Sequence, residues 1–275
     1  MWNRNDFLAA VPLGTVGMIH LQPLPGSPRW GGDLAAVRAA ALRDADALVE
    51  AGWGAVMVEN YHDVPFFPEA VPAHTVAALT ALVGAVRERH PGLVVGVNVL
   101  RNDAAAALGV AAATGARFVR VNVHAGAAVT DQGPLAGRAW HTLRLRRELG
   151  LEDVGILADV RVKHARPLVE RSLAEEAADL RLRGLADALI VTGPATGAPV
   201  ALDDLRAVRA ALPDCPLLAG SGATADTVAE LLRHADGCIV GSSLQRPEPA
   251  TGRPAPDPGR AHAFLAAVAA ARRKD

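Results

Sequence analysis

Eight short apolar runs, each followed by a segment of helical character, recur along the whole chain and constrain its fold more than any other feature. Runs this short and this continuously apolar are typical of parallel strands that are buried on both faces. The expected strands are Gly14–His20, Ala55–Glu59, Val94–Val99, Phe118–Val123, Val154–Val160, Ala188–Thr192, Leu217–Gly220 and Cys238–Gly241. Eight strands that alternate with helices predict an α/β fold, a closed (β/α)8 TIM barrel.

The segments between the runs are rich in Ala, Leu, Arg and Glu, and several end at stop signals such as Gly52 and Gly115. The expected helices are Asp33–Ala51, Pro72–Arg89, Asp103–Thr114, Arg138–Leu149, Leu173–Arg183, Leu202–Ala211, Ala225–Arg233 and Gly259–Arg272. The alternative, an open doubly wound sheet, needs a fold-back point and a Gly-rich first turn, and the sequence shows neither. No low-complexity linker divides the chain, so we expect residues 1–275 to form one barrel domain.

The composition excludes several classes of protein. A net charge of −1 argues against sequence-independent nucleic-acid binding. No apolar run approaches membrane-spanning length and the first residues lack a signal-peptide profile, so we expect a cytoplasmic protein without a transmembrane segment. The two cysteines, Cys215 and Cys238, lie in apolar contexts and are interpreted as buried thiols in a reducing compartment.

Two glycine-serine turns follow the seventh and eighth expected strands, within Leu217–Thr224 and Gly237–Leu244. In TIM barrels these two turns commonly form a phosphate site, because small residues leave backbone N–H groups exposed to an anion. The simpler interpretation is that the glycines only make tight turns between strand and helix. The pair in this order favours phosphate binding by Gly220, Ser221, Gly222, Gly241, Ser242 and Ser243.

Polar residues stand at strand positions where a parallel barrel normally carries apolar ones. Alternation along Phe118–His124 puts Arg120, Asn122 and His124 on one face. Asp159 on the next strand shares its parity with Lys163, which follows that strand. Polar groups inside a barrel are costly unless they meet partners or ligand. The other strands contribute candidates for the same ring, namely His20, Glu59, Asn98 and Thr192. A purely structural network, such as Arg120 paired with Glu59 or Asp159, is the alternative.

Acid–base chemistry is the strongest interpretation of this ring, and its candidate catalytic residues are Asp159, Lys163, Glu59 and Arg120. The chain has 26 arginines but only two lysines, so Lys163 stands out. A buried lysine can form a Schiff base, or it can neutralise a phosphate or carboxylate as a fixed cation, and we favour the charge role. His20, Asn98, Asn122, His124 and Thr192 are the candidates for substrate binding.

Three long loops are expected at the active end of the barrel: Asn60–Val71, His124–Gly137 and Gln245–Pro258. The second is rich in small residues, and we expect it to be a lid whose Asp131 and Gln132 bind substrate. A rigid loop packed on its neighbours is the alternative. No metal-ligand spacing is apparent, so we expect no cofactor, with a divalent metal as the minor alternative.

Several motifs in combination resemble the BtpA/SgcQ family. They are Gly17–Pro28, Met57–Asn60, Asn98–Asp103, Arg120–Val123, Thr130–Gly133, Ala158–Val160, Val162–His164, Thr192–Gly193 and Thr196–Gly197. The resemblance implies a ribulose-phosphate-binding type of barrel. It also implies a role in the biogenesis of membrane complexes such as photosystem I, with peripheral membrane association. The chain departs from the family pattern at His124, usually not ionisable, and at Gln245, where a lysine is usual.

These observations predict an enzyme that binds and transforms a phosphorylated small metabolite, a sugar phosphate or a nucleotide-like compound. Isomerisation, epimerisation and lyase chemistry all use such a set of residues and need no redox cofactor. The alternative is a non-catalytic assembly factor that uses the barrel as a scaffold. We also expect a homo-oligomer.

Overall fold

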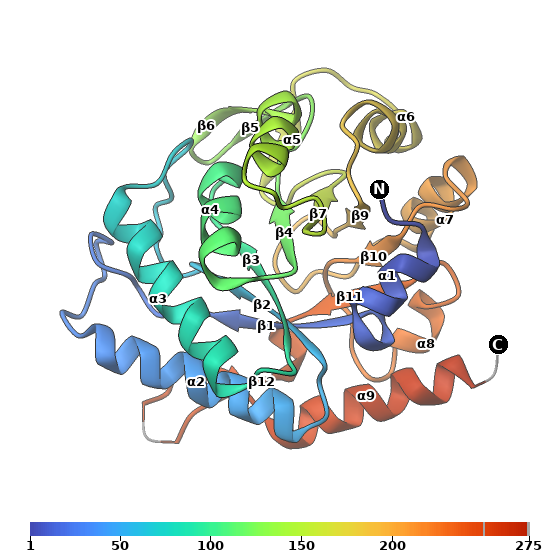
Figure 1. The fold of residues 1–275 in the computed structure, drawn as a ribbon. Helices are drawn as coiled ribbons and strands as arrows, with labels where there is room; N and C mark the ends of the chain where they lie inside the picture. Colours follow the sequence, from blue (N-terminus) through green and yellow to red (C-terminus); the bar gives the residue numbers. More distant parts are fainter. Residues whose placement is uncertain (250, 274–275) are drawn as a thin grey trace.

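The eight expected strands close into one parallel barrel in a computed structural model, which describes residues 1–249 and 251–273 (Figure 1). The barrel order is β1, β2, β3, β4, β7, β9, β10 and β11, with β11 pairing back onto β1. Their bounds are β1 Thr15–His20, β2 Ala55–Glu59, β3 Val94–Asn98, β4 Phe118–Val121, β7 Gly155–Asp159, β9 Ala188–Val191, β10 Leu217–Ala219 and β11 Gly237–Val240. The TIM-barrel prediction is confirmed, and no strand end is displaced by more than two residues.

Helices surround this barrel, as Figure 1 shows. Their bounds are α2 Leu34–Glu50, α3 Ala73–Arg89, α4 Ala104–Thr114, α5 Ala139–Glu148, α6 Leu173–Ala178, α7 Leu202–Ala211, α8 Val228–Leu231 and α9 Pro258–Arg272. Two differ from expectation. The sixth continues as a π-helical turn, η2 (Asp179–Arg183), and the seventh connection keeps only four helical residues, because Thr224 and Thr227 form a hydrogen-bonded turn in front of it.

The N-terminal end of the barrel is closed by a helix that the sequence analysis did not predict, α1 (Arg4–Ala10), followed by a short turn η1 (Pro12–Gly14). Asn3 caps α1 and Asp6 completes a capping box. Phe7 of α1 is fully buried and packs with inward-facing barrel residues, among them Met57, Phe118 and Leu157. The interior at this end is therefore an apolar layer that Phe7 of α1 closes.

The other end of the barrel carries two small additions. β5 (Ala127–Thr130), β6 (Gly133–Ala136) and β8 (Ala165–Pro167) form an antiparallel sheet in the order β6-β5-β8, and β12 (Gln245–Pro247) pairs with β13 (Pro254–Pro256). Leu135 of this sheet packs with Val123 and Val162 from the loops beneath it. The loop expected to be a lid is thus a paired hairpin that packs on neighbouring loops.

The described part of the chain contains no helix that combines the length and the apolar character needed to cross a bilayer.

Candidate functional site

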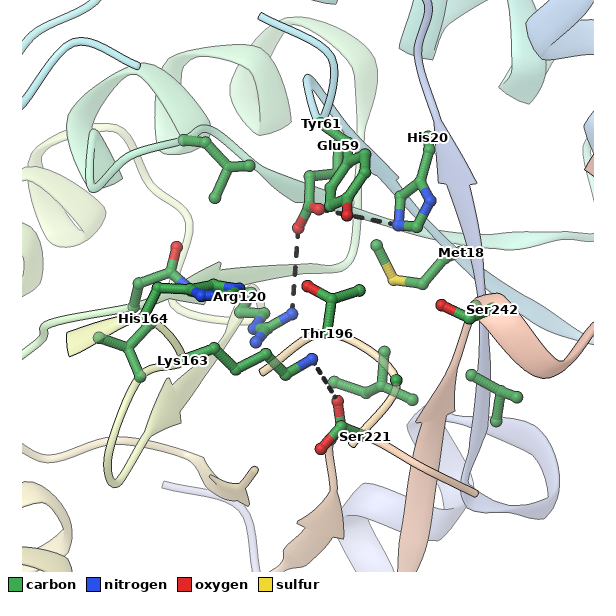
Figure 2. A pocket seen from close by; sticks show the side chains of 18 of the residues that line it. Met18, His20, Glu59, Tyr61, Arg120, Lys163, His164, Thr196, Ser221 and Ser242 are labelled. Atoms are coloured by element: carbon green, nitrogen blue, oxygen red, sulfur yellow. Dashed lines mark hydrogen bonds and ion pairs between the residues drawn. The ribbon is translucent and has the colours of Figure 1, made fainter. Parts of the chain in front are cut away.

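A cavity of about 710 Å³ opens where the carboxyl ends of the barrel strands meet. Figure 2 shows the labelled residues converging on it from opposite sides of the barrel. The lining includes four cationic side chains, Arg29, Arg101, Arg120 and Lys163, but only two carboxylates, Glu59 and Asp131. An excess of positive charge around a partly enclosed space favours an anionic ligand.

Arg120 is the central cation of the cavity and is held from behind. Its guanidinium donates to both carboxylate oxygens of Asp159, at 3.0 and 2.9 Å, and the Asn122 amide donates to Asp159 at 2.9 Å. Burial alone would lower the pKa of Arg120, but Asp159 and Glu59 outweigh it and raise that pKa. Asp159 is 2% exposed and does not line the cavity, so its role here is to fix Arg120.

Glu59 is the buried carboxylate of the cavity lining. Asn98 donates to it at 2.5 Å, and Arg120 approaches it at 3.9 Å. Asn98 and Asn122 each keep one buried side-chain oxygen without a partner. A buried acceptor without a donor is costly, and at the mouth of a cavity it is suited to a ligand hydroxyl. Of these two amides, Asn122 lines the cavity and Asn98 lies behind Glu59.

His20 stands beside Glu59 as a neutral ring. Burial lowers the pKa of His20 to about 4, against the attraction of Glu59. The Gln245 amide lies 3.2 Å from Nδ1, so the ring proton belongs on Nε2, which is 3.8 Å from Glu59 Oε1. Tyr61 stacks on the ring with centroids 4.2 Å apart. The contact between His20 and Glu59 is therefore polar and is not an ion pair at neutral pH.

Lys163 reaches the cavity from the loop after β7. Its ammonium nitrogen donates to the Gly220 carbonyl at 3.0 Å, and Arg101 holds the Lys163 carbonyl at 2.6 Å. Burial lowers the pKa of Lys163 to about 8, and the neighbouring Arg120 adds to the effect. Figure 2 places Lys163 beside Arg120 and directed at the turn that follows β10.

The two glycine-serine turns lie side by side on the cavity wall. The Ser243 hydroxyl donates to the Ala223 carbonyl at 2.7 Å and ties them together. Ser221 Oγ accepts from the Gly193 N–H at 2.6 Å, which leaves its own proton available. Within the described residues, the N–H groups of Gly222 and Ala223 meet no protein acceptor. No long helix begins at these turns, so an anion here would rely on turn N–H groups and not on a helix dipole.

The local geometry requires glycine at both Gly220 and Gly222 of the first turn. A side chain at Gly220 would collide with Ile190, and one at Gly222, where φ is +68°, would collide with the backbone of Pro199. Turn geometry alone therefore accounts for these glycines. Ser242 lacks such a constraint, because its side chain is exposed at the cavity edge.

Several predicted ligand contacts do not reach the cavity. His124 turns away after β4 ends at Val121 and bonds the Gly184 carbonyl at 2.8 Å, so alternation does not continue to it as expected. Thr192 donates to the Arg161 carbonyl, and Gln132 bonds Asp131 at the exposed hairpin tip. These three residues lie outside the lining of this cavity, as Asn98 and Asp159 do. Thr192 and Asp159 instead line a neighbouring cavity of about 1090 Å³. The described residues contain no group of three His, Cys, Asp or Glu side chains placed to hold a metal ion.

Other lining residues were missed from the sequence. Arg101 is 6% exposed, its Nε has no partner, and it lines the cavity together with Tyr61. Each is the second residue after an expected strand end, which is the signal that could have identified them. Among so many arginines, Arg101 did not stand out by residue type.

Sequence comparison assigns the chain to a family. The model of the BtpA family matches residues 13–270. The photosystem I biogenesis protein BtpA of a Synechocystis species is 46% identical over 257 residues, which is 92% of this chain and 87% of that protein. The chain belongs to the BtpA family.

Solved structures share the BtpA barrel at much lower identity. One is (S)-3-O-geranylgeranylglyceryl phosphate synthase from Thermoplasma acidophilum in complex with sn-glycerol-1-phosphate, with a TM-score of 0.58 at 16% identity over 98% of each chain. Another is N-(5'-phosphoribosyl)anthranilate isomerase from Pyrococcus furiosus, with a TM-score of 0.55 at 14% identity over 93% of this chain and 98% of that one. At these identities the likeness shows the fold alone.

Proposed function

We propose that this BtpA-family chain binds a phosphorylated small metabolite in the barrel mouth and transforms it by acid–base chemistry. One observation carries the proposal: the two paired turns, the first with open N–H groups, and a carboxylate flanked by cations line the same 710 Å³ cavity. That volume suits a sugar phosphate or a nucleotide-like compound. Isomerisation, epimerisation or lyase chemistry is the reaction class, without a redox cofactor.

Within this proposal each residue type has a distinct task. Glu59 moves the proton, because it faces the cavity whereas Asp159 is fully engaged behind Arg120. Arg101 and Arg120 stabilise negative charge that develops on the substrate. The Asn122 side-chain oxygen accepts a hydrogen bond from a substrate hydroxyl. The phosphate is bound by the turns at Gly220–Ala223 and Gly241–Ser243.

The fold neighbours support this proposal at the level of architecture. Two of them are named as enzymes of phosphate compounds, one with sn-glycerol-1-phosphate in its structure. TIM barrels frequently bind phosphate at the loops after their seventh and eighth strands, which are β10 and β11 here.

The proposal is tested at Ser242, whose exposed side chain can be changed without backbone strain. Inorganic phosphate and ribose 5-phosphate should raise the melting temperature, whereas ribose should not. Ser242→Asp should weaken ribose 5-phosphate binding at least about tenfold, or about 1.4 kcal/mol, by placing a second negative charge beside the phosphate. The neutral Ser242→Asn variant is the matched control, and both should unfold within about 0.5 kcal/mol of the parent. If the Asp and Asn variants bind ribose 5-phosphate with equal affinity, the phosphate does not bind at these turns.

A second candidate function is that of an assembly factor for a membrane complex. The name of the Synechocystis relative favours it, and so do large apolar side chains left exposed on α5 and after β8, including Trp140 at 63% and Val169 at 69%. A Trp140→Ser, Val169→Ser double variant would then fail to restore membrane-complex levels in a deletion strain, whereas Ser242→Asp would restore them. The opposite pattern would favour the enzyme.

A further inference from the structure

Lys163 differs from Arg120, the central cation of the barrel mouth, in having no carboxylate partner. Arg120 is paired with Asp159 through two hydrogen bonds, whereas Lys163 forms no ion pair within residues 1–249 and 251–273. Its single hydrogen bond goes to a neutral acceptor, the Gly220 carbonyl. The charged groups that act on it are Arg120, Asp159, Glu59 and Arg101.

An ammonium in this position is poorly stabilised. Desolvation and the adjacent Arg120 disfavour the proton more than Asp159 and Glu59 favour it, which is why the pKa of Lys163 falls to about 8. Near neutral pH, Lys163 is therefore a neutral amine in a far larger fraction of molecules than an ordinary lysine is. A neutral lysine amine is a nucleophile toward carbonyl carbon, whereas an ordinary surface lysine is almost entirely protonated.

The position of Lys163 also suits covalent chemistry. It lies between the phosphate-type turn, which it contacts at Gly220, and the face of the cavity that carries Glu59 and Arg120 (Figure 2). A ligand whose phosphate occupies the turns would extend its carbon chain past this amine. The loop is fixed there, because Arg101 donates to the Lys163 carbonyl at 2.6 Å.

We propose that Lys163 forms an imine with the carbonyl carbon of a phosphorylated 2-oxo compound, such as a ketose phosphate. The nitrogen lone pair forms the C–N bond, and one amine proton moves to the carbonyl oxygen to give a neutral carbinolamine. Glu59 or solvent donates a proton to that hydroxyl, which leaves as water, and then takes back the remaining N–H proton to leave C=N. Hydrolysis reverses each step. No oxidant or reductant is needed. This inference rests on the proposed function and assigns its substrate class.

Borohydride trapping tests the proposal, and the scarcity of lysine makes the result easy to interpret. The full chain is incubated with dihydroxyacetone phosphate, D-ribulose 5-phosphate or D-fructose 1-phosphate and reduced. Glycerol 3-phosphate, which has no carbonyl, is the negative control. Intact mass should rise by the mass of one probe less one oxygen, and peptide mapping should place the adduct on Lys163. The only other lysine, Lys274, reports background modification in the same sample.

The variant Lys163→Arg keeps the positive charge and should lose the adduct while still being stabilised by inorganic phosphate. An adduct of equal yield on Lys274, or one that persists in Lys163→Arg, would overturn the proposal. Stabilisation by ketose phosphates without any adduct would overturn it as well, and would leave the proposed phosphate-binding function standing. Absence of both stabilisation and adduct would overturn the two together.

Discussion

The two ends of the barrel interior are built from the same strands but have opposite chemistry. On β4, Phe118 lies in the apolar layer and Arg120, two residues on, lies in the polar one. The same change from an apolar to a charged residue occurs on β2, from Met57 to Glu59, and on β7, from Leu157 to Asp159. Because every second residue of a strand faces inward, one register places a hydrocarbon layer under a charged layer.

The layers also differ in how completely their groups are satisfied. The apolar layer is filled and closed by Phe7 of α1. The polar layer leaves oxygens of Asn98 and Asn122 without donors and Lys163 without a carboxylate, next to an open cavity. A filled layer serves stability, whereas unmatched polar groups cost stability and are retained where a ligand completes them.

The largest effect is expected from emptying the apolar layer. Phe7→Ala should destabilise the protein by about 3–5 kcal/mol, because a fully buried ring leaves a cavity behind. Chemical denaturation measures the loss, and Phe7→Leu, which keeps most of the volume, should cost less than about 1.5 kcal/mol. Phosphate affinity of the folded fraction should not change. A Phe7→Ala variant as stable as the parent would show that α1 does not close the barrel.

A smaller loss is expected where the polar layer is internally paired. Asp159→Asn should cost about 2–3 kcal/mol, since the carboxylate accepts three charge-assisted hydrogen bonds from Arg120 and Asn122. Urea unfolding at neutral pH gives the value. Turnover or ligand binding should fall as well, because Arg120 loses its support. Unchanged stability together with lost turnover would instead make Asp159 a reacting group.

The smallest effect is expected at Lys163, and it depends on pH. Its folded pKa of about 8 lies below the ordinary 10.5, so the unfolded chain binds the proton more tightly and the charge opposes folding below pH 8. The parent should therefore gain stability relative to Lys163→Met as pH rises from 8 to 10.5. The variant should be more stable by about 1–2 kcal/mol at pH 7, and the difference should shrink by pH 10. Paired urea titrations at pH 7 and 10 measure it. A stability difference that is the same at both pH values would mean that folding does not change the pKa of Lys163.

The repeating pattern was sufficient to predict the barrel from the sequence, because buried parallel strands are continuously apolar and their helices carry capping signals. The ring formed by Glu59, Arg120, Asn122 and Asp159 followed from the same alternation. The prediction failed for His124, since alternation has no meaning beyond the end of a strand, and this side chain faces Gly184. Lys163, expected just after its strand, does reach the site from the loop that follows β7. Pairing partners such as Gly193 for Ser221 depend on neighbouring loops and leave no local signal.

The way α1 is held has a consequence for the order in which the chain assembles. The Trp2 amide donates to Asp187, and Arg181 donates to the Trp2 carbonyl at 2.7 Å. Gly155 lacks a side chain where the Trp2 ring lies. Every one of these contacts is at least 150 residues away along the chain, so during vectorial synthesis α1 leaves the ribosome long before its binding surface exists. This early segment is therefore among the last to reach its native place, and until then the barrel floor exposes its hydrocarbon layer to water.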